Sequence, residues 1–146
     1  MNDWLGRAAP DLETIEAMAR ATVADLPERF AAPARGVMIR VEDFPDSETE
    51  EEMDLDSPFD LLGLYRGSSM LHKSVSDSTP QIDLIFLYRR PILDLWCESS
   101  DDLLSIVRHV LIHEIGHHFG FSDADMERLE DEAVAADEST ADYPRA

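Results

Sequence analysis

The chain has 146 residues, of which 44% are hydrophobic and 30% charged, and its formal net charge is −20. A chain of this length should form a single domain, residues 1–146, with a core of its own. It contains no run of about 18 apolar residues, so we predict no membrane span. The negative charge excludes nucleic acids and anionic membrane surfaces as expected partners, because their phosphates would repel the protein.

The cellular location is indicated by the start of the chain and by its cysteine content. The first residues show no basic region followed by an apolar stretch, so we expect no export signal. Cys97 is the single cysteine of the sequence and has no partner for an internal disulfide, which fits a reducing compartment. We therefore expect a cytoplasmic protein.

The first 60 residues predict a helix, a strand and a loop. Residues 11–30 have apolar side chains at helical spacing behind Asp11, which can cap the helix, and the helix should end near Pro27. Residues 36–42 are rich in β-branched side chains, which is typical of a strand. Residues 42–60 then contain ten acidic residues and no Lys or Arg, so we expect a mobile acidic surface loop there.

The middle of the chain predicts two more strands. Residues 59–71 contain two glycines that bound Leu-Tyr-Arg, which indicates a short turn leading into a strand. Residues 68–80 are polar and should form a connection. Residues 81–89 are the clearest strand, and because both of its faces are apolar it should be covered on both sides. Residues 92–97 fit either a short helix or a turn.

A long apolar helix and a shorter acidic one follow. Ser99 or Ser100 can cap the long helix, which should run to Phe119 and end at Gly120 in a left-handed turn. Its apolar residues lie on most sides, which predicts a central, buried helix. The acidic helix should span residues 123–136, and residues 137–146 should be a frayed acidic tail.

The long helix contains the pattern His-Glu-x-x-His at residues 113–117. Positions four apart share one face of a helix, so His113 and His117 can direct ring nitrogens at a single ion. Glu114 then lies beside that ion, where it can accept a proton from a zinc-activated water and pass it to the leaving amine. The alternative is a helix whose histidines only satisfy hydrogen bonds in the core.

A third metal ligand should come from the residues after Gly120, because the chain turns sharply there. Asp123 is our prediction for this ligand, with Asp125 and Glu127 as competitors. Asp123 could instead be only the N-cap of the acidic helix. We therefore predict a Zn2+ site formed by His113, His117 and Asp123.

Two other histidines lie close to this pattern. His118 is about 100° around the helix from His117, so it should point away from the metal and either pack or hydrogen-bond nearby. His109 shares the face of His113 but lies about 12 Å along the axis from His117, too far for all three to bind one ion. A place beside the substrate or at the rim of the core remains open for His109.

A peptidase also needs a donor to the carbonyl oxyanion and a surface for the peptide backbone. Tyr65, Tyr88 and Arg89 are candidates for the donor, and no spacing rule selects among them. For the backbone we expect strand addition at an edge strand, with residues 81–89 as the expected strand.

The sequence resembles a family of small bacterial zincin-like metallopeptidases with the motif HExxHxxGxxD, which is related to metzincins but has Asp in place of their third His. The matching pieces are residues 62–67, 85–92 and 113–123, and the resemblance covers most of residues 11–132. It implies an α+β fold: a compact, minimal zincin-like domain in which a small mixed β-sheet packs on the central active-site helix beside an N-terminal helix. It also implies zinc ligands at His113, His117 and Asp123 and a catalytic Glu114.

These features lead to one preferred function and two alternatives. The preferred function is a zinc-dependent metallopeptidase that hydrolyses peptides or unfolded protein segments by zinc-activated water, with Glu114 as general base. One alternative is a catalytically weak or inactive zinc-binding module for protein interaction. The other is a zinc hydrolase of a non-peptide amide.

Overall fold

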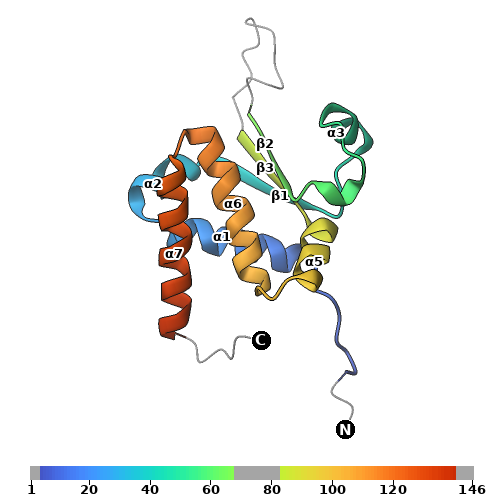
Figure 1. Cartoon of the computed structure of the whole chain (residues 1–146), viewed down its shortest axis with the longest axis horizontal. Coiled ribbons are helices and arrows are strands. Elements are labelled where there is room, and N and C mark those ends of the chain that lie inside the picture. The colour runs from blue at the N-terminus through green and yellow to red at the C-terminus, as the bar shows by residue number, and fades with distance from the viewer. Residues whose placement is uncertain (1–3, 68–82, 141–146) are drawn as a thin grey trace, which may run out of the picture.

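The computed structural model describes residues 4–67 and 83–140, with side chains through residue 131. Its helices and strands in chain order are α1 (Leu12–Asp25), α2 (Glu28–Ala34), β1 (Val37–Glu42), α3 (Ser47–Glu52), the 3-10 turn η1 (Pro58–Asp60), β2 (Gly63–Arg66), β3 (Asp83–Tyr88), α5 (Arg89–Glu98), α6 (Leu103–Phe119) and α7 (Asp123–Thr140). None of the helices in these ranges has the length and apolar character of a membrane span. Helix α6 lies between α7 and the sheet (Figure 1).

The three strands form a mixed sheet in the order β1-β3-β2, with β1 parallel and β2 antiparallel to β3. This confirms the predicted α+β fold with a small mixed sheet on a central helix. Ile85 and Leu87 on one face of β3 are fully buried, and Tyr88 on the other face is also buried, as expected for a strand that is covered on both faces. The prediction that residues 81–89 provide a free edge for a peptide is wrong, because β3 is paired on both sides. Strand β2 is an edge strand and contacts α6.

The helix predicted over residues 11–30 is two helices. Asp11 caps α1 as predicted, since its carboxylate accepts a hydrogen bond from the Thr14 amide at 2.8 Å. Leu26 is extended, with ψ of 144°, because a residue that precedes proline is disfavoured in helical conformation. The chain therefore turns at Pro27, and Phe30 lies in α2 instead of extending α1.

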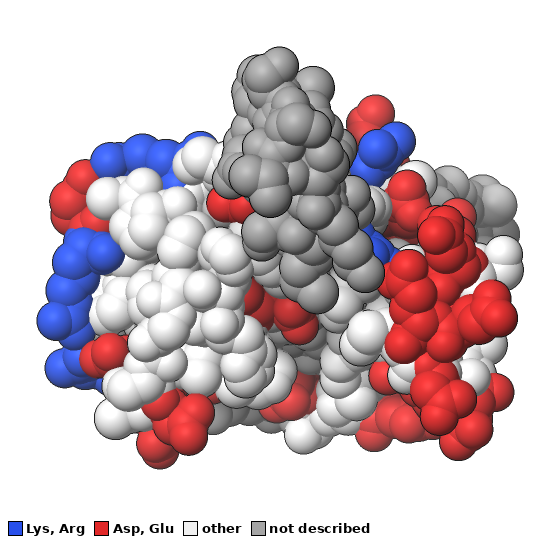
Figure 2. All heavy atoms as spheres, turned by 90° about the horizontal axis from the view of Figure 1, so that it is seen from above, with Lys and Arg blue, Asp and Glu red and all other residues white. Residues whose placement is uncertain are grey.

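The acidic surface loop expected over residues 42–60 contains two short helical elements, α3 and η1. The Asp46 carboxylate caps α3 by accepting from the Thr49 amide at 2.7 Å, and Ser57 and Asp60 form a capping box around η1. Negative side chains are favourable at a helix N-terminus. Arg66 also donates to Glu52 at 2.7 Å. Acidic side chains gather at the α3 end of the molecule, and basic ones at the opposite end (Figure 2).

Helix α6 is the centre of the core, as predicted. Its N-cap is Asp102 instead of Ser99 or Ser100, because the Asp102 carboxylate accepts from the Ser105 amide at 2.7 Å. It ends at Gly120, whose φ of 71° is the left-handed conformation expected there. The apolar residues of α6 that are buried are Leu103, Ile106, Val107, Val110, Leu111, Ile112 and Ile115.

The remaining predictions concern the C-terminal part and the connection between β2 and β3. Helix α5 spans the segment 92–97, which is therefore helical. Helix α7 begins at Asp123 as predicted but continues through Thr140, so the part of the expected tail at residues 137–140 is helical. The polar connection predicted at 68–80 and the tail at 141–146 lie outside the described residues.

Two glycines allow other elements to approach α6 closely. A Cβ atom added at Gly116 would lie 2.9 Å from Met126 Cγ of α7, and closer still to its sulfur atom. A Cβ added at Gly63 of β2 would lie 2.6 Å from Val110 Cγ1 of α6. Both distances are shorter than carbon atoms in contact allow. The contact of α6 with α7 therefore requires glycine at position 116, and its contact with β2 requires glycine at position 63.

The Gly116 contact predicts that Gly116→Val destabilises the fold. The added side chain would overlap Met126, so we expect the free energy of unfolding to fall by about 2 kcal/mol, a typical cost of overpacking. Urea denaturation of the variant and the parent measures this difference. Gly36→Val is the control, because a Cβ at Gly36 meets no atom within 4 Å. Equal stability of the two variants would contradict the close α6–α7 contact.

Candidate metal centre

His113, Glu114 and His117 lie on α6, and Asp123 is the first residue of α7. The ring centres of His113 and His117 are 6.1 Å apart, with an angle of 55° between the rings. Two imidazoles on one tetrahedral zinc would have ring centres roughly 5 Å apart, since each Zn–N bond is about 2.0–2.1 Å. The ring centres are therefore about 1 Å further apart than in a ligating pair, so the two rings would have to rotate to bind one ion.

Glu114 is half-buried between α6 and the edge strand β2. Its Oε2 accepts a hydrogen bond from the Tyr65 backbone amide at 3.1 Å. Burial raises the pKa of Glu114 above its ordinary value, while the Tyr65 amide and the nearby His117 oppose this shift. The carboxylate is thus held in one orientation by the sheet, with a pKa moved toward the range in which a general base works well.

Of the predicted ligands, Asp123 is exposed at the first turn of α7. The alternative that Asp123 only caps α7 is wrong, because Ser122 has that position: its hydroxyl accepts from the Asp125 amide at 3.0 Å. Asp125 pairs with Arg29 at 3.3 Å and with Arg128. The Ser122 hydroxyl and these arginines hold the pKa of Asp125 below its ordinary value. Asp125 is therefore already engaged, whereas Asp123 lies at the end of α6 where His117 lies.

Three other ligand-type side chains lie close together further along the two helices. The Oε1 atom of Glu130 is 2.6 Å from His109 Nδ1 and 3.3 Å from His113 Nε2. Among the residues that the structure describes, His109, His113 and Glu130 are the group whose ligand atoms all lie within 4.8 Å of one another. His117 and Asp123 are not in this group.

The buried Oε1 atom of Glu130 tests whether these residues fit a metal ion. This oxygen has no hydrogen-bond partner, so its two close imidazole nitrogens do not meet it in hydrogen-bond geometry. A buried carboxylate oxygen without a partner is costly, and a cation between the three groups would satisfy it. Two imidazole nitrogens and one carboxylate oxygen are a common ligand set for zinc. These three side chains therefore fit a zinc ion, and His113 is the one among them that belongs to the predicted ligand set.

Glu130 was not among the residues predicted from the sequence. The signal that could have found it is the turn at Gly120, which sends α7 back along α6. Starting from the contact between Gly116 and Met126, one helical turn back on α6 and one turn forward on α7 bring His113 opposite Glu130.

His118 points away from His117, as predicted, and packs on Tyr65. The two rings are stacked with centres 3.6 Å apart, and the Tyr65 hydroxyl is 2.6 Å from His118 Nε2. Asp83 Oδ2 lies 3.9 Å from the same nitrogen. Burial, together with the Asp83 carboxylate, raises the pKa of Tyr65 above its ordinary value, so the phenol remains protonated.

The three candidates for an oxyanion donor now differ in position. Tyr88 is buried in the core, with only 2% of its surface exposed. Arg89 donates to the Pro10 carbonyl at 2.6 Å and to Asp43 at 2.9 Å. Tyr65 is the candidate whose backbone contacts Glu114. Tyr65 is therefore the one best placed for chemistry at α6.

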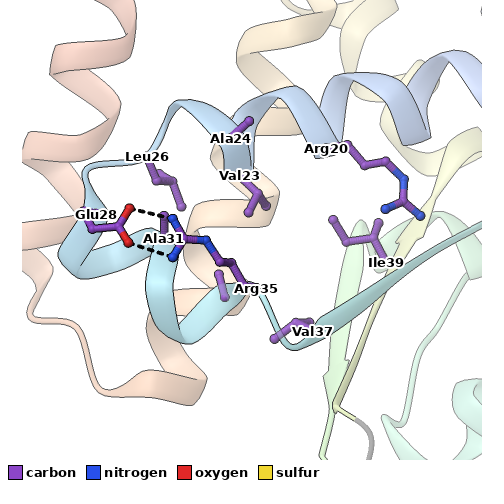
Figure 3. A pocket seen from close by; sticks show the side chains of 10 residues that line it. Arg20, Val23, Ala24, Leu26, Glu28, Ala31, Arg35, Val37 and Ile39 are labelled. Atoms are coloured by element: carbon purple, nitrogen blue, oxygen red, sulfur yellow. Dashed lines mark hydrogen bonds and ion pairs between the residues drawn. The ribbon is translucent and has the colours of Figure 1, made fainter.

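A cavity of about 280 Å³ lies elsewhere, between α1, α2 and the start of β1. Arg20, Val23 and Ile39 are among the side chains that line it (Figure 3). At its edge Arg35 donates two hydrogen bonds to Glu28, at 2.7 and 2.6 Å. None of the predicted metal ligands lines this cavity, so the candidate metal site lies apart from it, on α6 and α7.

Comparison with known proteins gives one family. A search of curated proteins found no significant match. The family model described as zincin-like metallopeptidase matches residues 34–133, a range that includes the sheet, all of α6 and the first turns of α7. Because this match spans more than half of the 146 residues, the chain belongs to the zincin-like metallopeptidase family.

Proposed function

We propose that this protein is a zinc-dependent metallopeptidase that cleaves peptides or unfolded protein segments in the cytoplasm. The observation that supports this most directly is the placement of Glu114, which the Tyr65 amide holds beside the His113 and His117 pair. Membership in a family of zincin-like metallopeptidases supports zinc as the metal. The single cysteine, Cys97, is free, which supports a reducing compartment.

The proposed ligands of the catalytic zinc are His113, His117 and Asp123. The first two are one helical turn apart on α6, and the chain reversal at Gly120 returns Asp123 toward the same end of that helix. When bound there, zinc supplies a Lewis acid that activates water and polarises the scissile carbonyl.

Glu114 would act as the general base in this reaction. One carboxylate oxygen is fixed by the Tyr65 amide, which leaves the other to accept a proton from the attacking water and return it to the leaving amine. The raised pKa of Glu114 makes it a better proton acceptor than an exposed carboxylate. The same carboxyl group would then donate this proton to the leaving amine.

The substrate backbone would lie along β2, and Tyr65 would donate to the carbonyl oxygen. Strand β2 is an edge strand of the sheet and contacts α6, which suits strand addition by an extended peptide. The protonated Tyr65 hydroxyl would leave His118 and donate a hydrogen bond to the developing oxyanion. This hydrogen bond would be strongest in the transition state.

The role of Glu114 predicts that Glu114→Gln lowers kcat by about 10²–10⁴-fold, the usual contribution of a general base. Its zinc content should not change, because Glu114 is not a ligand. His117→Ala should instead weaken zinc retention during dialysis against a chelator. Metal analysis and turnover of a broad peptide library measure both effects.

Three outcomes would count against the proposal. A parent protein that binds no stoichiometric zinc would contradict the metal site itself. A parent that binds zinc but cleaves no peptide under varied conditions would favour a zinc-binding module for protein interaction. Equal turnover by the parent and Glu114→Gln would remove Glu114 from the mechanism.

The third ligand is tested by comparing Asp123→Ala with Asp125→Ala. Loss of a ligand should reduce zinc affinity by more than the roughly 10–100-fold typical of groups that only support a ligand. Asp125→Ala removes the contacts with Arg29 and Arg128 and should mainly lower stability. Competition with a chromogenic chelator gives the two affinities. Equal or reversed effects would exclude Asp123 as the ligand.

Tyr65→Phe tests the oxyanion donor. The variant keeps the backbone amide that holds Glu114, so only the hydroxyl is lost, and kcat should fall by about 10²-fold, as for other oxyanion donors. Zinc content should stay at the parental value. Tyr88→Phe is the matched control, because it removes a buried hydroxyl from the neighbouring strand. An equal loss of kcat in both variants would argue against a direct role for Tyr65.

A further inference from the structure

His109, His113 and His117 are spaced four residues apart, so α6 presents two overlapping pairs of imidazoles. The ring centres of His109 and His113 are 4.3 Å apart, compared with 6.1 Å for His113 and His117. His109 and His117 are separated by about 12 Å along the axis. One ion can therefore bind either pair but not all three rings, and His113 belongs to both pairs.

The pair formed by His109 and His113 has its own carboxylate. Helices α6 and α7 lie side by side (Figure 1), and Glu130 of α7 points its Oε1 atom at both imidazoles, 2.6 Å from His109 Nδ1 and 3.3 Å from His113 Nε2. This oxygen is buried and has no hydrogen-bond partner. A cation bound between the two nitrogens and this oxygen would give the oxygen the partner that it lacks.

We propose that His109, His113 and Glu130 form a second binding site for a divalent metal ion, which shares His113 with the His113–His117 pair. The competition between the two sites rests on the proposed function, because it requires that the catalytic metal use His113. The second site itself depends only on the geometry of α6 and α7.

The ligand set indicates which metals the second site takes. Two imidazoles and one carboxylate favour Zn2+, Co2+ or Ni2+ over Mg2+ or Ca2+, which prefer oxygen ligands. The side chains are 57%, 36% and 26% exposed for His109, His113 and Glu130, so metal can enter from solvent. The net charge of −20 also attracts cations. A metal bound here withdraws His113 from catalysis, so the two sites compete for a single ion.

The test uses the full chain, stripped of metal and titrated with Co2+, whose visible absorption reports binding. His117→Ala breaks the catalytic pair and leaves the second site intact, so it should still bind one equivalent of Co2+. Adding Glu130→Gln to His117→Ala should weaken this binding by at least about tenfold. Adding Asp131→Asn, which changes the exposed neighbour on α7, should leave it unchanged.

The outcomes separate the two proposals. If His117→Ala binds no Co2+ while the parent does, or if Glu130→Gln has no more effect than Asp131→Asn, the second site is refuted and the catalytic site stands. If the parent binds Co2+ no more tightly than His117→Ala, the second site stands and His117 is not a ligand in the catalytic site.

Hydrogen exchange provides a second measurement that does not require the His117 variant. Zn2+ added to the metal-free parent should connect α7 to α6 through Glu130 and slow amide exchange over residues 123–131. Glu130→Gln should show less of this protection than the parent, and Asp131→Asn should show it in full. Equal protection in the parent and in Glu130→Gln would contradict the proposed site.

Discussion

The arrangement of the metal-binding side chains depends on the close contact between α6 and α7 at Gly116. Because this position has no side chain, Met126 fits directly against the α6 backbone, and Gly120 reverses the chain in a left-handed conformation just before α7 begins. The amides of Gly120 and Phe121 both donate to the Gly116 carbonyl, which closes the turn. The direction of α7 along α6, and with it the location of every carboxylate on α7, follows from this turn.

The sheet contributes to the site through a backbone group. Strand β2 packs against α6 where Gly63 meets Val110, and this brings the Tyr65 amide to Glu114. Every substitution at its own position except proline keeps a backbone amide, so the orientation of the base is built into the fold. The same strand places the Tyr65 ring against His118. His118 therefore packs on the sheet and does not point toward the proposed metal site.

Local features were predictable from the sequence, and those that depend on packing were not. Asp11 and Gly120 act within one turn of helix, so their roles could be identified from neighbouring residues. Helix α3 was missed because its acidic composition is typical of disorder, although Asp46 caps it. Strand β3 was predicted, but its central place depends on pairing with distant strands. Glu130 could not be found without knowing that α7 folds back on α6.

The core of the protein is divided, and this affects how firmly a metal can be held. The main cluster joins α1, the sheet, α5 and α6, whereas a smaller one attaches α7 through Phe30, Ile112, Met126 and Leu129. Regions held by few apolar contacts open more readily than the rest of a domain. Detachment of α7 would remove its carboxylates from the histidines while the sheet and α6 stayed folded. Metal affinity is then thermodynamically linked to the docking of this one helix, so residues that offer no ligand atom, such as Phe30, help to set it.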